Sequence, residues 1–272
     1  MPDGLPGELT PPFEFSLAFV EPGRVLEFGD SHIVYPYKSV TKLFAAWATL
    51  VAIERGYVDL GDEVAIGHSG ERIVTLRHLL AHASGLSFRT DDFEAEVEEK
   101  RIYSNRGIEV AAKHVETATG TDFSRWTEEV VLEPLGLIET LIDGSPAHAG
   151  EGSIRDLIVF GRELLRPTLI GEELANEARQ TVFPGLRGLT PGFGSYSDNT
   201  WGLGLEIKNQ KVRTWFPRSA SPQTFGHFGQ SGSFLWIDPL SGRSAAFLGV
   251  EPFGAWHKKH WQRLSDFFYD TY

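Results

Sequence analysis

The sequence predicts an α+β fold, with strands near both ends of the chain and helices between them. Strand-like stretches cover residues 13–20 and 24–28. Residues 57 to about 195 are mainly helix and loop, whereas from Trp201 onward the apolar residues follow the period of two that half-buried strands show. Strands early and late in the chain, with helices between, fit an α+β sandwich that carries an inserted helical region.

Each further element follows from a local pattern. The first long helix begins at Ser39 and ends before Gly56; its apolar residues surround it widely, as in a helix buried between layers. Residues 91–101 are dense in charge and predict a solvated surface segment. The other expected elements are an irregular arm at 1–12, helices at 75–83, 108–119, 122–132, 153–166 and 255–272, a long loop at 185–199, and strands at 202–208, 232–238 and 244–250.

Composition limits the possible functions. The chain has 272 residues, 41% of them hydrophobic and 23% charged, which is typical of a folded globular protein. A formal net charge of -12 argues against nucleic-acid partners and against charge-driven binding to membranes. The chain has no cysteine, so disulfides, thiol catalysis and thiolate metal sites are excluded. The first residues show no signal-peptide pattern and no apolar run is long enough to cross a membrane, so we expect a cytoplasmic protein.

The tetrad Ser39-Val40-Thr41-Lys42 is the most informative motif. Residues three apart in a helix share a face, so Ser39 and Lys42 point the same way. A serine hydroxyl needs a neighbouring group to take its proton before it can act as a nucleophile, and Lys42 is placed to do so or to tune the group that does. A helix start also favours developing negative charge. The alternative is a purely structural role, in which Ser39 is the N-cap of the helix.

Four further segments follow the tetrad in order: Leu79-Leu80-Ala81-His82-Ala83-Ser84-Gly85-Leu86, Tyr103-Ser104-Asn105, Leu132-Glu133-Pro134-Leu135-Gly136-Leu137, and Gly226-His227-Phe228-Gly229-Gln230-Ser231-Gly232. This order resembles the serine β-lactamase and penicillin-binding-protein superfamily, which carries S-x-x-K, a second Ser or Tyr with Asn, and K-T-G. The resemblance is greatest to the branch of class C β-lactamases, D-alanyl-D-alanine carboxypeptidases and related esterases, where the second element is Y-x-N and the third is often H-x-G.

The resemblance implies a more detailed architecture. It predicts an antiparallel β-sheet flanked by helices, with an inserted all-α lobe, as in β-lactamases and transpeptidases. Residues 1–60 and 200–272 would form the α/β sandwich, residues 61–199 the mainly helical region, and the site would lie at their junction in one compact catalytic unit.

The resemblance also assigns roles. Ser39 is the nucleophile, and Lys42 exchanges protons with Ser39 and Tyr103. Tyr103 is the general base, which requires a large downward shift of its pKa; Lys42 is the expected cause. The backbone N–H groups of Ser39 and Gln230 form the oxyanion hole. Asn105 hydrogen-bonds the acyl side chain of the substrate or Lys42. Without the resemblance, Tyr103 also fits a core tyrosine and Asn105 a turn.

The third motif departs from K-T-G. His227 is mostly neutral at pH 7 and would become charged as the pH is lowered toward 6. Phe228 lacks the hydroxyl that helps to hold a substrate carboxylate, so we expect uncharged esters or amides to be preferred. Gly229 would allow close approach of the backbone to a ligand on an edge strand. Lys38, just before the nucleophile, either steers anions or points outward.

Three functions are therefore considered. The first is a cytoplasmic serine hydrolase that acts through an acyl-enzyme on a small ester or amide, with no metal or cofactor. The second is a true β-lactamase or D-alanyl-D-alanine peptidase, and the third is a non-catalytic binding or sensor protein on the same fold. His78 and His82 have the i, i+4 spacing of metal ligands, but the Glu of the zinc-protease pattern is missing, so a structural role is favoured. The oligomeric state is left open.

Overall fold

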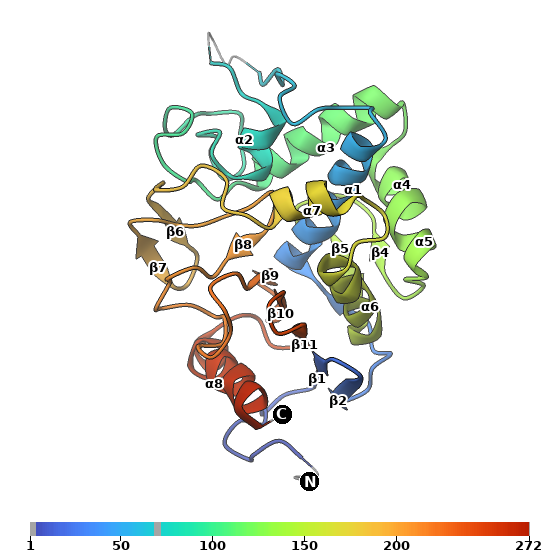
Figure 1. Cartoon of the computed structure of the whole chain (residues 1–272), viewed down its shortest axis with the longest axis vertical. Helices are drawn as coiled ribbons and strands as arrows, with labels where there is room; N and C mark the ends of the chain where they lie inside the picture. The colour runs from blue at the N-terminus through green and yellow to red at the C-terminus, as the bar shows by residue number, and fades with distance from the viewer. Residues whose placement is uncertain (1–3, 68–71, 272) are drawn as a thin grey trace.

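A six-stranded antiparallel sheet forms the centre of the molecule (Figure 1). The computed structural model describes residues 4–67 and 72–271. The start of the expected N-terminal arm and the last residue of the expected final helix lie outside these ranges. The strand order is β2-β1-β11-β10-β9-β8. The bounds are β1 Phe15–Glu21, β2 Arg24–Phe28, β8 Glu206–Ile207, β9 Phe225–Gly229, β10 Ser233–Asp238 and β11 Arg243–Gly249.

The sheet joins the two ends of the chain. Strand β1 pairs with β11 in the register Phe15 opposite Gly249 and Val20 opposite Ser244. Both termini consequently lie near one end of the molecule (Figure 1). The expected antiparallel sheet of N- and C-terminal strands is therefore confirmed.

Helices cover both faces of this sheet (Figure 1). Ala18 and Val20 belong to a core that includes α1 and α6, whereas Leu17 and Phe19 belong to a second, aromatic core beneath α8. This alternation follows the two-residue period of a strand. The bounds are α1 Thr41–Glu54, α2 Leu76–Leu80, α3 Asn105–Thr119, α4 Phe123–Thr127, α5 Glu133–Leu135, α6 Ile154–Leu165, α7 Glu172–Ala178 and α8 Ala255–Thr271, with a 3₁₀ turn at Lys38–Val40 and a π-helical turn at Glu128–Leu132.

Between β2 and β8 the chain forms short strands that the sequence analysis did not place. One small sheet has the order β3-β5-β4, with β3 Tyr35–Pro36, β4 Leu141–Ile142 and β5 Gly150–Gly152. A second pairs β6 Gly188–Thr190 with β7 Gly194–Tyr196, within the segment expected to be a long loop. The α+β class is confirmed, and the inserted region carries these strands beside its helices. The division at residues 60 and 200 remains a prediction.

Two local expectations need correction. The expected strand 202–208 is shortened to β8, because Gly204 has φ of +77° and a Cβ there would lie 2.3 Å from the Ala46 Cβ. Arg101 closes the segment expected to be solvated, yet it is 2% exposed and donates to the carbonyl oxygens of Val182 and Phe183 at 2.8 and 2.9 Å. No helix within residues 4–67 and 72–271 has both the length and the apolar character needed to cross a bilayer.

Candidate active site

The turn before α1 presents Ser39. Tyr37 is fully buried, and its hydroxyl contacts Thr140 Oγ1 at 3.1 Å and the Ser153 carbonyl oxygen at 3.2 Å. Lys38 follows with φ of +48°, a left-handed conformation that a non-glycine residue adopts only when its surroundings enforce it. Ser39 then lies in the 3₁₀ turn, and the N-cap position of α1 is Val40. The Ser39 side chain makes no capping hydrogen bond, so the interpretation of Ser39 as a helix cap is wrong.

Strand β9 ends against this turn because of Gly229. A Cβ on Gly229 would lie 2.2 Å from the Tyr37 carbonyl oxygen and 2.5 Å from Ser233 Oγ, so no larger residue fits. Ser233 Oγ also donates to the Tyr37 carbonyl oxygen at 2.8 Å. At Gly229 the structure thus shows a close approach to the turn that carries Ser39, and the expected approach to a ligand remains a prediction. The close approach to the turn brings Gln230 to the pocket that Ser39 lines.

Lys42 is completely buried and points at Ser39. Its Nζ lies 3.2 Å from Ser39 Oγ, 2.6 Å from Asn105 Oδ1 and 2.8 Å from the Ala147 carbonyl oxygen. Burial lowers the pKa of Lys42 to about 7, an effect that the charge of Glu109 partly opposes. The Asn105 and Ala147 oxygens can only accept. A neutral amine that donates to both therefore keeps its lone pair for the Ser39 hydroxyl.

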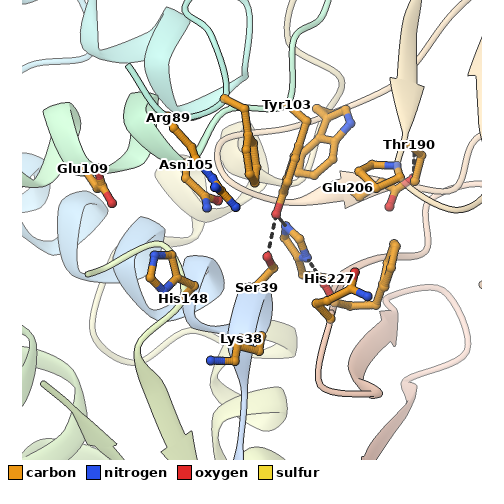
Figure 2. A pocket seen from close by; sticks show the side chains of 15 residues that line it. Lys38, Ser39, Arg89, Tyr103, Asn105, Glu109, His148, Thr190, Glu206 and His227 are labelled. Carbon is orange, nitrogen blue, oxygen red and sulfur yellow. Dashed lines mark hydrogen bonds between the residues drawn. The ribbon is translucent and has the colours of Figure 1, made fainter. Parts of the chain in front are cut away.

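Tyr103 approaches Ser39 from another side. Its hydroxyl donates to Ser39 Oγ at 2.8 Å (Figure 2). Lys42 Nζ lies 4.8 Å from the centroid of the Tyr103 ring. Burial raises the pKa of Tyr103, and the hydrogen bond to Ser39 opposes this only in part. The expected downward shift is therefore wrong: the phenol keeps its proton and acts as a donor, while the group with the lowered pKa is Lys42.

His227 is neutral over the physiological range. Its Nδ1 lies 2.7 Å from the Phe228 carbonyl oxygen and must donate to it, so Nε2 carries no proton. Nε2 lies 3.5 Å from the Tyr103 oxygen, whose one proton is donated to Ser39. Burial, assisted by the charge of Lys42, lowers the pKa of His227 to about 3. The expectation that His227 becomes charged near pH 6 is therefore wrong.

Phe228 has two roles. Its ring belongs to the aromatic core beneath α8, with ring centroids 5.0 Å from Phe253 and 5.6 Å from Trp215. It also lines the catalytic pocket, although only 7% of it is exposed. The pocket therefore has an apolar wall at Phe228, as expected, and the core packing holds that wall in place.

The pocket around Ser39 has a volume of about 700 Å³, a size suited to a small organic molecule. Figure 2 shows Lys38, Asn105, Glu109 and His148 to one side of Ser39, and Thr190, Glu206 and His227 to the other. Of the expected site residues, Ser39, Tyr103, Asn105, His227, Phe228 and Gln230 line it, while Lys42 and Gly229 support it from behind. Lys38 is exposed and lines the pocket too.

Several wall residues were missed by sequence reasoning. Trp201 is 2% exposed, with its ring centroid 5.7 Å from that of Tyr103. Glu206 pairs with Lys211 at 2.9 Å and accepts from Trp215 Nε1 at 2.8 Å. The acidic and aromatic residues after position 200 could have indicated a pocket wall, but their spacing matches no known motif.

The paired histidines are structural. His78 Nδ1 accepts from the Thr75 backbone N–H at 3.0 Å and helps to cap α2, while its Nε2 lies 2.9 Å from Glu98 Oε1. His82 Nδ1 accepts from the Ser104 backbone N–H at 3.2 Å and so fixes the strand-like segment that carries Tyr103. In the part of the chain that the structure describes, no group of three or more His, Asp or Glu side chains could hold a metal ion.

Comparison with known proteins agrees with this geometry. The family model described as Beta-lactamase matches residues 30–249. A beta-lactamase structure from Mycobacterium bovis is 39% identical, with a TM-score of 0.90 and 95% of each chain covered. A hydrolase with promiscuous acyltransferase activity has the same fold at 16% identity, with a TM-score of 0.76 and 93% of each chain covered.

Among curated proteins, one of Escherichia coli (strain K12), provisionally named a D-alanyl-D-alanine carboxypeptidase, is 26% identical. The match covers 56% of this chain and 45% of that protein. The chain thus spans about half the length of the curated relatives it matches.

Proposed function

The chain belongs to the Beta-lactamase family, and on that premise we propose that it is a serine hydrolase acting through an acyl-enzyme on a small, uncharged ester or amide. One observation carries the proposal. Ser39 Oγ lies between a buried amine whose pKa is lowered to about 7 and a phenol that donates to it. A serine placed between a proton acceptor and a proton donor is equipped for nucleophilic catalysis.

In acylation, Ser39 Oγ attacks the carbonyl carbon while its proton passes to the neutral amine of Lys42. A new C–O bond forms, and the carbonyl oxygen becomes an oxyanion, which the backbone N–H groups of Ser39 and Gln230 would stabilise. Collapse breaks the bond to the leaving alcohol or amine. Tyr103 gives its proton to that leaving atom, and the Lys42 ammonium returns its proton to the phenolate.

Deacylation repeats these steps with water. A water molecule loses a proton to the neutral amine of Lys42 and attacks the carbonyl carbon of the acyl-enzyme. The bond to Ser39 Oγ then breaks, and the Lys42 ammonium returns that proton to Ser39 Oγ. The products are a carboxylic acid and the original enzyme, so the cycle consumes one water and requires no cofactor.

The chemistry of the strand β9 wall supports an uncharged substrate. A charged hydrogen bond contributes about 1.5–3 kcal/mol, so a wall that offers a neutral His227 and the apolar Phe228 binds a carboxylate about tenfold to a hundredfold less well than Lys and Thr would. A cytoplasmic location remains a prediction.

A β-lactam or D-alanyl-D-alanine substrate is the second candidate. The names of the similar proteins favour it, and two cations, Lys38 and Arg89, line the pocket and could receive a carboxylate. A non-catalytic binding protein is the third candidate. The hydrogen bonds that join Ser39 to Lys42 and Tyr103 argue against it.

One panel separates the three candidates. The wild type, Ser39→Ala and the matched control Ser124→Ala, which alters a serine of α4 that lines neither the catalytic pocket nor the pocket beside it, are assayed with p-nitrophenyl acetate, p-nitrophenyl butyrate and a chromogenic cephalosporin. We expect ester hydrolysis to be lost only in Ser39→Ala and intact-mass spectrometry to find a phosphonate label only on Ser39. A higher kcat/KM for the cephalosporin than for both esters would favour the second candidate, and no Ser39-dependent turnover the third.

A further inference from the structure

A second pocket adjoins the catalytic one. It has a volume of about 620 Å³ and shares Phe88, Tyr103 and Pro191 with the catalytic pocket. Its remaining apolar lining includes Ile102, Leu189 and Tyr196. Each pocket alone has the size of a small-molecule site, and the three side chains that they share place the two pockets side by side.

The second pocket gathers hydrophobic surface that folding leaves exposed. Phe88 is 39% exposed and Leu189 is 53% exposed, and both line it. They come from segments far apart in the chain, the loop after α2 and strand β6. Apolar surface gathered in a hollow beside a reactive group is typical of a ligand subsite.

The charges around this pocket are largely occupied by the protein itself. The Arg101 guanidinium donates to the carbonyl oxygens of Ala81, Val182 and Phe183. Arg187 lies 3.8 Å from Glu99. Glu94 and Lys100 complete the charged lining with opposite signs. This arrangement leaves the apolar side chains as the main contribution to recognition.

The position of Tyr103 decides which part of the substrate enters the second pocket. In the proposed reaction the Tyr103 hydroxyl protonates the leaving atom, so the leaving group lies on the Tyr103 side of Ser39. Tyr103 is also a wall that both pockets share. A leaving group longer than a few atoms therefore extends past Phe88 and Pro191 toward Leu189.

We propose that the second pocket is a leaving-group subsite, and that the chain prefers esters or amides of extended apolar alcohols or amines over those of short ones. This inference rests on the proposed hydrolase function. It assigns to Leu189, which does not touch the reacting atoms, a role in substrate specificity.

The kinetic test varies the alcohol and the acyl group separately. Ethyl, butyl and hexyl acetate form one series, and p-nitrophenyl acetate, butyrate and hexanoate the other. Each methylene that enters the pocket should raise kcat/KM in the alkyl acetate series by about threefold to fourfold. Leu189→Asp and the milder Leu189→Thr should flatten that series, so that hexyl acetate is hydrolysed no faster than ethyl acetate. Leu240→Asp, at a leucine that is 67% exposed and lines neither pocket, is the matched control.

The inference is overturned if the alkyl acetate series is flat in the wild type, or if Leu189→Asp flattens the acyl series instead. A binding measurement separates this failure from failure of the proposed function. NMR titration of Ser39→Ala with ethanol, butan-1-ol and hexan-1-ol needs no turnover. Affinity that rises with chain length and is lost in Leu189→Asp supports the subsite even if no ester is hydrolysed; affinity independent of Leu189 removes it.

Discussion

Lys42 and Lys211 are both buried beside the catalytic pocket, but their partners differ. Lys211 Nζ lies 2.9 Å from Glu206 and donates to the Thr200 carbonyl oxygen at 3.1 Å. Among the residues that the structure describes, the hydrogen-bond partners of Lys42 Nζ are neutral oxygens, those of Ser39, Asn105 and Ala147. Burial lowers the pKa of both amines, and for Lys211 the carboxylate of Glu206 opposes the shift. The difference shows that a buried lysine without a carboxylate contact is the one suited to accept a proton.

Removing each lysine in turn is the strongest test of this comparison. Lys42→Met should lower kcat/KM by roughly 10³–10⁴ because the proton acceptor is lost. The pKa of Lys42 is lowered on folding from 10.5 to about 7, so its charging opposes folding most strongly below pH 7, and the penalty disappears above about pH 10.5. At pH 7 the variant should therefore raise the free energy of unfolding, by about 1–3 kcal/mol after the lost hydrogen bonds are deducted.

Lys211→Met should do the reverse. It leaves the Glu206 carboxylate buried without its cation, which typically costs about 3–5 kcal/mol of unfolding free energy. Urea unfolding and single-turnover kinetics measure the two effects separately. If Lys42→Met were the less stable variant, or Lys211→Met the less active, the proposed division between the two lysines would be wrong.

Tyr103→Phe tests whether the phenol or the amine takes the serine proton. If Tyr103 protonates the leaving group, the variant should lose roughly 10²–10⁴ in kcat/KM on an alkyl acetate, whose alkoxide needs a proton, and far less on p-nitrophenyl acetate. Equal losses on both substrates would return the role of base to Tyr103. Near-wild-type rates on both would leave Lys42 as the sole proton carrier.

The pH dependence of kcat/KM gives a further test. The proton acceptor Lys42 has a pKa of about 7, so kcat/KM should fall about tenfold per pH unit below 7 and level off above it. His227, with a pKa of about 3, should add no inflection between pH 5 and 8. Ester hydrolysis followed from pH 5 to 10 measures this. A rate that keeps rising to pH 10 would indicate a phenolate base instead.

The smallest expected effect concerns substrate charge. The double variant His227→Lys with Phe228→Thr should raise kcat/KM for a cephalosporin relative to p-nitrophenyl acetate by about tenfold, because it restores a charged and a hydroxyl donor. Phe228→Thr alone is the control, since it removes the same aromatic packing against Phe253 and Trp215. An unchanged ratio would mean that carboxylates are bound elsewhere, for instance by Lys38 and Arg89.

Sequence reasoning predicted the elements that alternate or repeat strongly. Strand β1 and the hairpin of β10 and β11 have alternating or fully buried apolar residues, and α3 carries a clear apolar face. Strands β3, β4 and β5 have only two or three residues each, which is too short for any period to be visible. Helix α7 was missed because its sequence, Glu-Glu-Leu-Ala-Asn-Glu-Ala, has a single large apolar residue.

The site divides in the same way. Ser39 and Lys42 are linked by helical spacing, and Tyr103 and Asn105 by a short motif. Local sequence was therefore sufficient to identify these four residues as candidates. Trp201 and Glu206 reach the pocket through loops and a two-residue strand, where no spacing rule applies. The protonation states could not be predicted from the sequence, because they depend on burial in the folded protein, which raises the pKa of Tyr103 and lowers that of Lys42.

The contact between Ser233 and Tyr37 links residues 196 positions apart, and it joins the nucleophile turn to the strand that leads to Gln230. During synthesis on the ribosome, Ser39 and Lys42 emerge long before β9 and β10 exist. The proposed oxyanion hole needs Gln230, so it can form only after the last quarter of the chain has been made and β11 has paired with β1. An incomplete chain would therefore lack the proposed oxyanion hole, and the appearance of the proposed ester hydrolysis during refolding would report completion of the central sheet.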